Sequence, residues 1–181
     1  MLDSENKRKT ITAAWKALEL KSPLGPMIAV ADAESLYGLR FREGQKHTPT
    51  MIRFVQQVPI IQARESKIFA LLEEELAHYF KGTLQSFKTP IHCLGTSFQH
   101  AVWQALQTIP FGMTCSYSAL AISIGSPSSV RAVANANGAN PLSILMPCHR
   151  VLYKNRDLGG YAAGTDRKQW LLDHEKKHQR F

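Results

Sequence analysis

The sequence has 181 residues, of which 44% are hydrophobic, so it can bury a sizeable core as one large domain or two small ones. No stretch approaches the roughly 18 consecutive apolar residues of a membrane-spanning helix, which excludes that class and predicts no membrane partner. The net charge of +8, from 22 basic and 14 acidic residues, favours a polyanionic partner. The three cysteines are an odd number, and no basic start precedes an apolar run. Both features indicate a reducing intracellular compartment, the cytoplasm or a eukaryotic nucleus.

The first ninety residues predict a small α+β unit. After a lead-in or short strand around Trp15, two apolar runs, 26–32 and 35–42, are separated by two residues, a spacing typical of an antiparallel hairpin. Further on, apolar residues recur at intervals of three and four and predict a helix that ends at Gly82: Ile68, Leu71, Leu72, Leu76, Tyr79 and Phe80. We find no cluster in this half that carries recognisable chemistry.

Helical patterns dominate the second half. An extended connector leads to an apolar stripe that predicts a helix ending before Pro110, formed by Phe98, Val102, Ala105, Leu106 and Ile109. Ser116 is placed to cap a helix over 117–124, and the break at 125–127 separates it from a second helix over about 128–138. Two short helices around a glycine-containing turn are typical of a helix-turn-helix.

The second of these helices has two faces. The packing face consists of Val130, Val133 and Ala134. The other face is polar or small and consists of Arg131, Asn135 and Gly138. The small residues Ala132, Ala136 and Gly138 would let the helix backbone approach a nucleic acid closely. A plain two-helix packing unit is the alternative interpretation at this point.

The pentapeptide Pro147-Cys148-His149-Arg150-Val151 contains the best candidate nucleophile. It follows the apolar run 144–146, which predicts a buried strand that delivers the thiol against an imidazole. A free cysteine with a pKa of about 8.5 is only slightly ionised at neutral pH, so the thiol needs a neighbouring base. His149 is that base if the backbone turns sharply after Pro147.

Glu175 is a candidate partner for the histidine. Thr165 is placed to cap the last helix, and Glu175 follows Leu171 by four residues and Leu172 by three, which puts it on the inward face. An inward carboxylate needs a partner. A solvated glutamate beside two lysines at the helix end is the alternative.

Together these segments resemble a known family, the O6-alkylguanine-DNA alkyltransferases, also called methylated-DNA-protein-cysteine methyltransferases. The strong resemblance covers about residues 95–176 and is carried by Thr96-Ser97-Phe98-Gln99, Val102-Trp103, residues 128–141, Pro147-Cys148-His149-Arg150-Val151, Gly159-Gly160-Tyr161 and residues 170–175. A weaker one extends to the first half through Ser22-Pro23-Leu24-Gly25 and residues 76–82.

The resemblance implies a chemistry. Such proteins transfer an alkyl group from O6 of guanine, and O4 of thymine, irreversibly to their own cysteine, here Cys148, once per molecule. His149 would deprotonate the thiol through a bound water, and Glu175 would hold the imidazole in its useful tautomer. Asn140 matches an asparagine hinge between the DNA-binding helix and the cysteine, although a plain turn residue is the alternative. The reaction needs no cofactor or metal. The zinc-binding cysteines that some relatives carry near the N-terminus are missing, and Cys93 and Cys115 are expected to be structural.

The family flips the damaged nucleotide out of the duplex. Arg131 matches the arginine that fills the vacated space, on a helix that lies in the minor groove with Ala132 and Asn135. Tyr117 matches a tyrosine that promotes rotation of the nucleotide and contacts its base, although an ordinary half-buried aromatic is the alternative.

The base pocket would be walled by the glycine-rich loop 157–164, with Tyr117 beside it. Tyr161 would supply an aromatic face and backbone groups would read the guanine edge. The remaining pocket positions are Ser143, Ala162 and Ala163. Ser143 stands where some members carry proline, and Ala162 replaces a common serine.

The expected fold is α+β: a small N-terminal roll-like domain with an antiparallel sheet, residues 1–92, and a mostly helical C-terminal domain, residues 93–181, with the helix-turn-helix and the active-site cysteine. The expected partner is double-stranded DNA containing O6-alkylguanine, bound by a monomer. The alternatives are a non-catalytic protein that binds alkylated DNA and a helix-turn-helix regulator.

Overall fold

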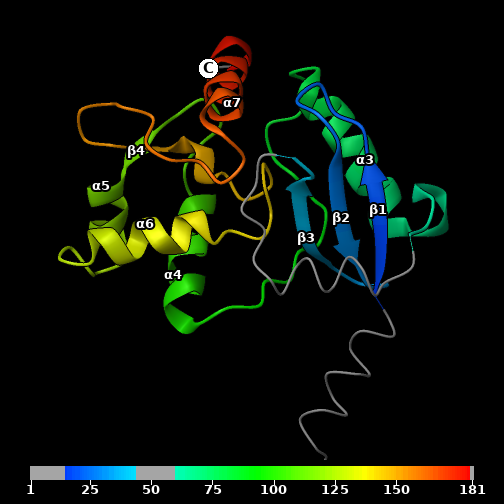
Figure 1. The fold of residues 1–181 in the computed structure, drawn as a ribbon, viewed down its shortest axis with the longest axis horizontal. Helices are drawn as coiled ribbons and strands as arrows, with labels where there is room; N and C mark the ends of the chain where they lie inside the picture. The colour runs from blue at the N-terminus through cyan, green and yellow to red at the C-terminus, as the bar shows by residue number, and fades with distance from the viewer. Residues whose placement is uncertain (1–14, 44–59, 180–181) are drawn as a thin grey trace, which may run out of the picture.

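The computed structural model describes residues 15–43 and 60–179. Its first half contains a three-stranded antiparallel sheet in the order β1-β2-β3, formed by β1 (Lys16–Leu20), β2 (Met27–Ala31) and β3 (Leu36–Phe41). Helix α3 (Lys67–Phe80) covers one face of this sheet, and the short 3-10 helix η1 (Ala63–Glu65) precedes it (Figure 1).

The predicted hairpin is confirmed as β2 and β3. Met27 pairs with Phe41 and Ile28 with Arg40, and the register shifts by a bulge between Val30 and Ala31. The Asp32 carboxylate closes the turn by accepting hydrogen bonds from the backbone N–H groups of the next residues. All five residues of β2 are buried, because α3 packs on one face and a second apolar cluster covers the other.

The helix predicted to end at Gly82 is also confirmed. Its apolar stripe packs on the sheet, and Gly82 adopts a left-handed φ of 72° that lets the chain leave the helix. The next helix, α4 (Ser97–Gln107), begins with a capping box in which the Thr96 side chain accepts from Gln99 N and the Gln99 side chain accepts from Thr96 N.

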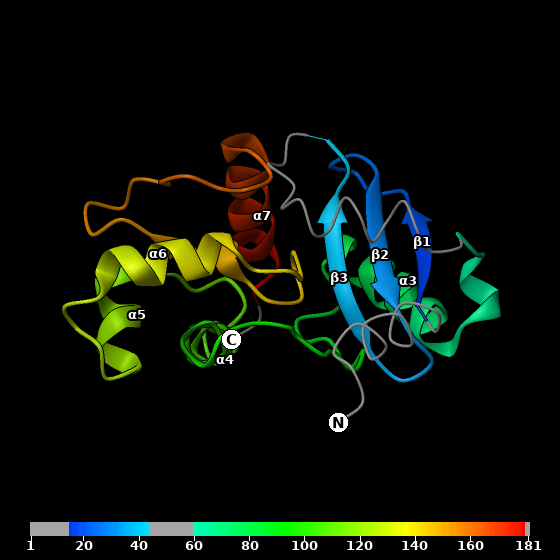
Figure 2. The same cartoon turned by 60° about the horizontal axis from the view of Figure 1, so that its bottom comes forward.

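The second half consists mainly of helices packed around α4. The elements, in chain order, are β4 (Cys115–Ser116), α5 (Tyr117–Ser123), α6 (Val130–Gly138), the 3-10 helix η2 (Cys148–Arg150), β5 (Val151–Leu152) and α7 (Thr165–His178). The two helices expected around the glycine turn are α5 and α6, which pack on each other and on α4 (Figure 2). Ser116 caps α5 as predicted, by accepting from Ala119 N.

Short parallel pairing of β4 and β5 brings the start of α5 beside the segment that follows the cysteine. Cys115 pairs with Val151, and Ser116 with Leu152. Tyr117, the first residue of α5, is therefore held close to η2, although 30 residues of chain separate Tyr117 from Pro147.

Four local details differ from the expectations. The buried run 144–146 is not a strand: Ile144 has a φ of 73°, and Cys148 begins the turn η2. Burial alone does not distinguish a strand from a buried irregular segment, because both consist of consecutive apolar residues. Helix α6 begins at Val130 rather than near Ser128, and α7 has Gly164 rather than Thr165 as its N-cap. Ala136 is buried at 4% exposure, so it packs inside and does not widen the small-residue face.

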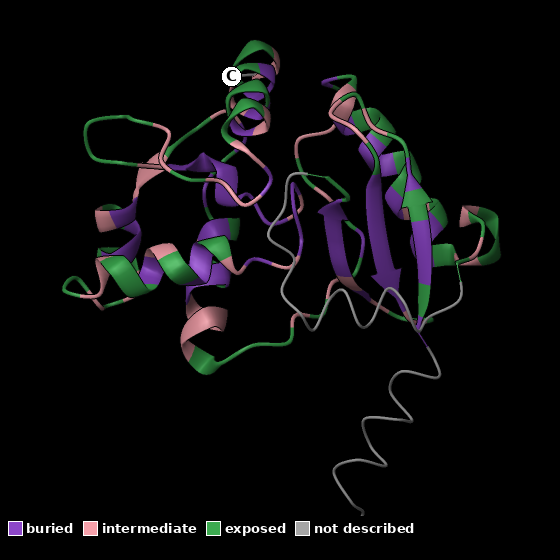
Figure 3. Ribbon diagram, in the orientation of Figure 1, coloured by how far each residue is buried: buried purple, intermediate pink, exposed green. Residues whose placement is uncertain are grey.

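One hydrophobic core extends across both halves, from Leu18 in β1 to Leu171 in α7. Figure 3 shows buried residues in the sheet and in the helices of the second half. A backbone contact also crosses between them, since Leu39 bridges to Leu142. The division into domains 1–92 and 93–181 stays a prediction about folding units. Within residues 15–43 and 60–179, no helix is both long and apolar enough to cross a membrane.

Candidate active site

The candidate catalytic side chains converge from three segments. Cys148 and His149 lie in η2, Asn140 lies in the segment after α6, and Glu175 lies on α7. All four are buried, with His149 and Glu175 at 0% exposure. The structure therefore brings together the four residues predicted to carry the chemistry.

Glu175 is the centre of a buried hydrogen-bond network. Its Oε1 lies 2.8 Å from His149 Nε2 and accepts a 2.8 Å hydrogen bond from the Tyr79 hydroxyl. Arg150 donates from Nε to Oε2 at 2.8 Å and from Nη2 to Oε1 at 3.0 Å, and Gly112 N donates to Oε2 at 3.1 Å. Such saturation allows a carboxylate to stay charged inside a protein.

The electrostatics give the carboxylate and the imidazole distinct protonation states. Burial raises the pKa of Glu175, but the hydrogen bonds from His149 and Arg150 and the positive charge of Arg150 outweigh burial and hold that pKa well below its usual range. Burial lowers the pKa of His149 despite the adjacent Glu175. At neutral pH, His149 is therefore a neutral imidazole that donates through Nε2 to a charged glutamate.

His149 Nδ1, the other ring nitrogen, is buried and makes no hydrogen bond to any residue that the structure describes. In the tautomer set by Glu175 it carries a lone pair, so it is able to accept a proton. No direct hydrogen bond joins His149 to the Cys148 sulfur within residues 15–43 and 60–179. The two side chains are adjacent in η2, and the bound water between them that the resemblance implies stays a prediction.

Cys148 is buried at 6% exposure. Burial raises the pKa of its thiol, whereas the Asn140 side chain and the charges of Lys168 and Arg40 favour the thiolate. The Asn140 Nδ2 group donates to Cys148 Sγ at 2.9 Å. The surroundings thus combine an apolar enclosure with donors and cations that would stabilise a thiolate once it forms.

Asn140 organises the segment that leads to the cysteine. Its Oδ1 accepts from Leu142 N at 2.8 Å, and its Nδ2 donates to Met146 O at 2.7 Å as well as to the sulfur. Its own carbonyl accepts from Arg40 Nη2 at 2.9 Å. These bonds curl residues 140–148 into a compact loop, which explains why the predicted strand does not form.

A small cavity of about 20 Å³ opens beside the sulfur. It is lined by Asn137, Gly138, Asn140, Ser143, Cys148, Gly160, Tyr161 and Ala162. Three predicted pocket positions, Ser143, Tyr161 and Ala162, lie on this wall. The other two do not: Ala163 is buried in the core at 1% exposure, and Tyr117 lies outside the lining.

The Tyr161 hydroxyl lies beside the sulfur. Burial and the charge of Cys148 raise the pKa of Tyr161 well above its ordinary value. The hydroxyl oxygen is buried, and no geometrically acceptable hydrogen bond joins it to a described residue. A buried, protonated phenol therefore stays available as a donor next to the nucleophile.

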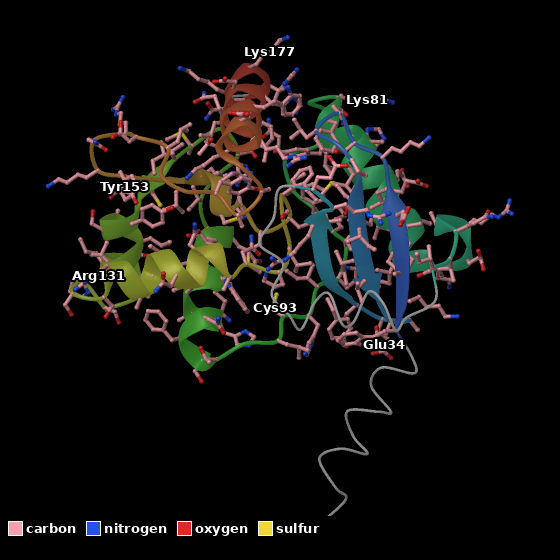
Figure 4. All side chains as sticks on the ribbon, viewed as in Figure 1. Glu34, Lys81, Cys93, Arg131, Tyr153 and Lys177 are labelled. Atoms are coloured by element: carbon pink, nitrogen blue, oxygen red, sulfur yellow. The ribbon has the colours of Figure 1, made fainter. Side chains whose placement is uncertain are left out.

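The predicted DNA-contact residues are exposed on α6. Arg131, Ala132 and Asn135 all face solvent, and Figure 4 shows Arg131 at the end of α6 farthest from the sheet. Tyr117 is buried at 6% exposure at the start of α5. Burial raises its pKa, as does the charge of Cys148, which places the tyrosine near the nucleophile.

Sequence reasoning missed several buried polar residues around the site. Tyr79 and Arg150 bind Glu175, and Arg40 binds the Asn140 carbonyl. Lys168 is fully buried, donates to Val151 O at 2.7 Å and to the Leu158 carbonyl, and has a pKa lowered by burial to about 8.

Only some of these residues carried a signal in the sequence. Lys168, Leu171 and Glu175 are spaced by three and four residues, so the same argument that turned Glu175 inward also applied to Lys168. Arg150 belongs to the cysteine motif itself. Nothing local marks Tyr79 or Arg40.

The other two cysteines are half-buried. Burial raises the pKa of Cys93 to about 11 and also raises that of Cys115. Among the described residues, neither thiol has an activating neighbour of the kind that surrounds Cys148, and their role as structural thiols stays a prediction.

Comparison with known proteins identifies relatives that match most of the chain. The profile described as "6-O-methylguanine DNA methyltransferase, DNA binding domain" matches residues 97–177. A methylated-DNA–protein-cysteine methyltransferase of Methanosarcina barkeri is 38% identical, over 89% of this chain and 97% of the relative.

Solved structures of such proteins are also similar to this chain. The O6-methylguanine methyltransferase of Mycobacterium tuberculosis has a TM-score of 0.81 and 36% identity, covering 92% of this chain and 95% of that one. A structure titled as the same organism's OGT in complex with DNA also has a TM-score of 0.81 at 36% identity, over 90% and 94% of the two chains. Because relatives at this identity match over nearly their full length, the chain belongs to the methylated-DNA–protein-cysteine methyltransferase family.

Proposed function

We propose that this protein repairs alkylated DNA by transferring the alkyl group from O6 of guanine, and from O4 of thymine, to Cys148 in a single irreversible turnover. The observation that carries the assignment is the buried arrangement of the Cys148 thiol, a neutral His149 and a charged Glu175. Family membership supports the same chemistry for a thiol in this setting.

The chemical step follows from these groups. His149 Nδ1 accepts the thiol proton through a water, and Glu175 stabilises the imidazolium that forms. The thiolate attacks the alkyl carbon, a carbon–sulfur bond forms, and the carbon–oxygen bond breaks with its electron pair passing to the guanine oxygen. The Tyr161 hydroxyl beside the sulfur is available to donate a hydrogen bond to that oxygen.

The substrate reaches the thiol as an extruded nucleotide. Guanine O6 inside a stacked duplex cannot approach a sulfur that is 6% exposed. A cavity of about 20 Å³ is large enough for about one water molecule and far too small for a purine base, so the loop 157–164 must move to admit a base. Helix α6, with Arg131, Ala132 and Asn135 exposed, would contact the minor groove, and Tyr117 would contact the rotating base.

The test is intact-protein mass spectrometry after incubation with duplex DNA containing O6-methylguanine. We expect one added methyl group, on a peptide containing Cys148, and no turnover beyond one equivalent. C148S should abolish transfer and keep DNA binding, whereas C93S and C115S should react like the natural protein. Methyl on Cys93 or Cys115, or continued turnover, would contradict the assignment.

The same experiment addresses the alternatives. A non-catalytic lesion binder or a helix-turn-helix regulator would remain unmodified, and neither explains why a buried carboxylate, imidazole and thiol are assembled at one place. We further propose that the protein acts as a monomer on double-stranded DNA in the cytoplasm, or the nucleus of a eukaryote. Its free thiols, among the described residues, support a reducing compartment, and sedimentation with and without DNA tests the monomer.

A further inference from the structure

Tyr153 is an exposed aromatic residue in the loop that follows β5. Its side chain, which is labelled in Figure 4, is 53% exposed. The centroid of its ring lies 5.5 Å from that of the Tyr117 ring, and the two ring planes are tilted by 55°. Gly159 lies against the same ring, because a methyl group added there would be 2.8 Å from Tyr153 Cε2. The Tyr153 ring therefore contacts both the start of α5 and the loop that continues into the cavity wall.

The Tyr117 ring has a second neighbour. Lys168 Nζ lies 6.0 Å from its ring centroid, and the Tyr117 hydroxyl interacts with the Asn137 side chain. Tyr117 is itself only 6% exposed. Tyr117 thus contacts the exposed Tyr153 ring as well as the buried side chains of Lys168 and Asn137.

The loop that carries Tyr153 is tied down at several points. Tyr153 N donates to Asp157 O and Arg156 N donates to Tyr153 O, each at 2.9 Å. Lys168 Nζ binds the Leu158 carbonyl at the end of this turn. A displacement of the Tyr153 ring would therefore be transmitted to Gly159 and to the cavity wall that begins at Gly160.

We propose that Tyr153 is a positioning residue for base entry: its ring holds Tyr117 and the pocket loop in the relative positions that receive the extruded nucleotide. The inference rests on the proposed function and assigns a role in the reaction to a residue outside the cavity lining. The ring performs this role, because the Tyr153 hydroxyl makes no hydrogen bond to any residue in the described ranges.

Single-turnover rates at saturating duplex DNA containing O6-methylguanine test the proposal. Y153A should slow transfer by about three- to tenfold, the range that corresponds to the loss of one aromatic pair. Y153F keeps the ring and should react at the natural rate. An equal loss in Y153F and Y153A would overturn the proposal.

A double-mutant cycle separates positioning from a general effect on the fold. If Tyr153 acts through Tyr117, Y153A should have little further effect on transfer in a Y117A background. Two changes that act independently would instead multiply their effects. A multiplicative loss in the Y117A/Y153A protein would show that Tyr153 does not work through Tyr117.

Gly159 offers a second approach to the same contact. G159A places a methyl group against the Tyr153 ring. G125A serves as the control, because a methyl group there has no heavy atom within 4 Å. The backbone cost of the two substitutions is similar, since Gly159 and Gly125 have φ values of 64° and 71°. Comparing the unfolding free energies of these variants isolates the collision from the backbone cost. G159A should slow transfer, and G159A/Y153A should be no slower than Y153A. A rate of G159A that is unchanged would contradict the proposal.

Two further readouts keep the possible failures distinct. If the natural protein acquires no methyl group on Cys148, the proposed function fails. If it is methylated but Y153A loses duplex affinity without any change in the saturated rate, Tyr153 is a direct DNA contact and only the present inference fails.

Discussion

Glu175 shows how one buried charge depends on its neighbours. It accepts hydrogen bonds from Tyr79, His149, Arg150 and Gly112, and Arg150 also donates to Ile109 O at 2.6 Å. We expect E175Q to lower the free energy of unfolding by about 3–5 kcal/mol, because it leaves the buried Arg150 cation without its counter-charge. Urea denaturation measures the loss.

A matched control exists in the first half of the chain. Glu75 is also buried, at 6% exposure, but it accepts only neutral donors from Lys88 N and Thr89 among the described contacts. E75Q should cost less, about 1–3 kcal/mol, and leave alkyl transfer unchanged. Equal losses of stability in the two variants would argue against the special importance of the Arg150–Glu175 pair.

The lowered pKa of His149 predicts how the free energy of unfolding depends on pH. Burial lowers the pKa of His149 in the folded protein. In the unfolded chain the same histidine has a pKa of about 6.5, so it takes up a proton first as pH falls. The stabilisation linked to neutral His149 is therefore complete above about pH 6.5 and declines below it. Glu175, whose pKa is held low, contributes a further decline only below its unfolded pKa of about 4.3.

The measurement is the unfolding free energy at pH 7.5 and pH 5.5 for the natural protein, H149Q and H78Q. His174 also has a pKa lowered by burial, so some dependence remains in every variant. H149Q should show a smaller decrease than H78Q, which removes an exposed histidine outside the site. Identical decreases in the two variants would mean that His149 is not the group that titrates.

At the scale of elements, α6 separates DNA contact from chemistry. Arg131 is exposed on this helix and does not line the cavity at Cys148. If it recovers roughly 1.4–3 kcal/mol of the cost of extruding a nucleotide, R131A should repair duplex DNA roughly ten- to a hundredfold more slowly. Its reaction with a free O6-alkylguanine base should barely change.

Single-turnover rates on the two substrates test this assignment. K81A serves as the control, because it removes one exposed positive charge from the end of α3 instead. R131A should leave the unfolding free energy within about 0.5 kcal/mol of the natural value, as for other surface changes. Equal losses of rate on the duplex and the free base would mean that Arg131 supports the active site rather than extrusion.

At the scale of the whole molecule, contacts between the two halves predict cooperative unfolding. The Tyr79 hydroxyl binds Glu175, Arg40 binds the Asn140 carbonyl, and one apolar cluster includes residues of both halves. We expect a single thermal transition whose calorimetric and van't Hoff enthalpies agree. Two separated transitions would show that 1–92 and 93–181 unfold as independent domains.

The sequence by itself determined the elements whose information is local. The cap at Ser116, the stripe that became α3, and the hairpin of β2 and β3 each depend on neighbours within a few residues. It also identified Cys148, His149 and Glu175, because a motif and a helical spacing marked them. The family resemblance then supplied an expected chemistry for these residues.

Only the tertiary structure decided which distant residues surround the candidate active site. Tyr79 meets Glu175 across 96 residues of chain, and Arg40 meets Asn140 across 100, contacts that no local pattern encodes. The hydrogen bonds of Asn140 hold a curled loop where a strand was expected. The turn η2 determines how the Cys148 and His149 side chains lie relative to each other. Burial is a sum over the whole fold, so the pKa values of the thiol, the imidazole and the carboxylate could be read only after the chain had folded around them.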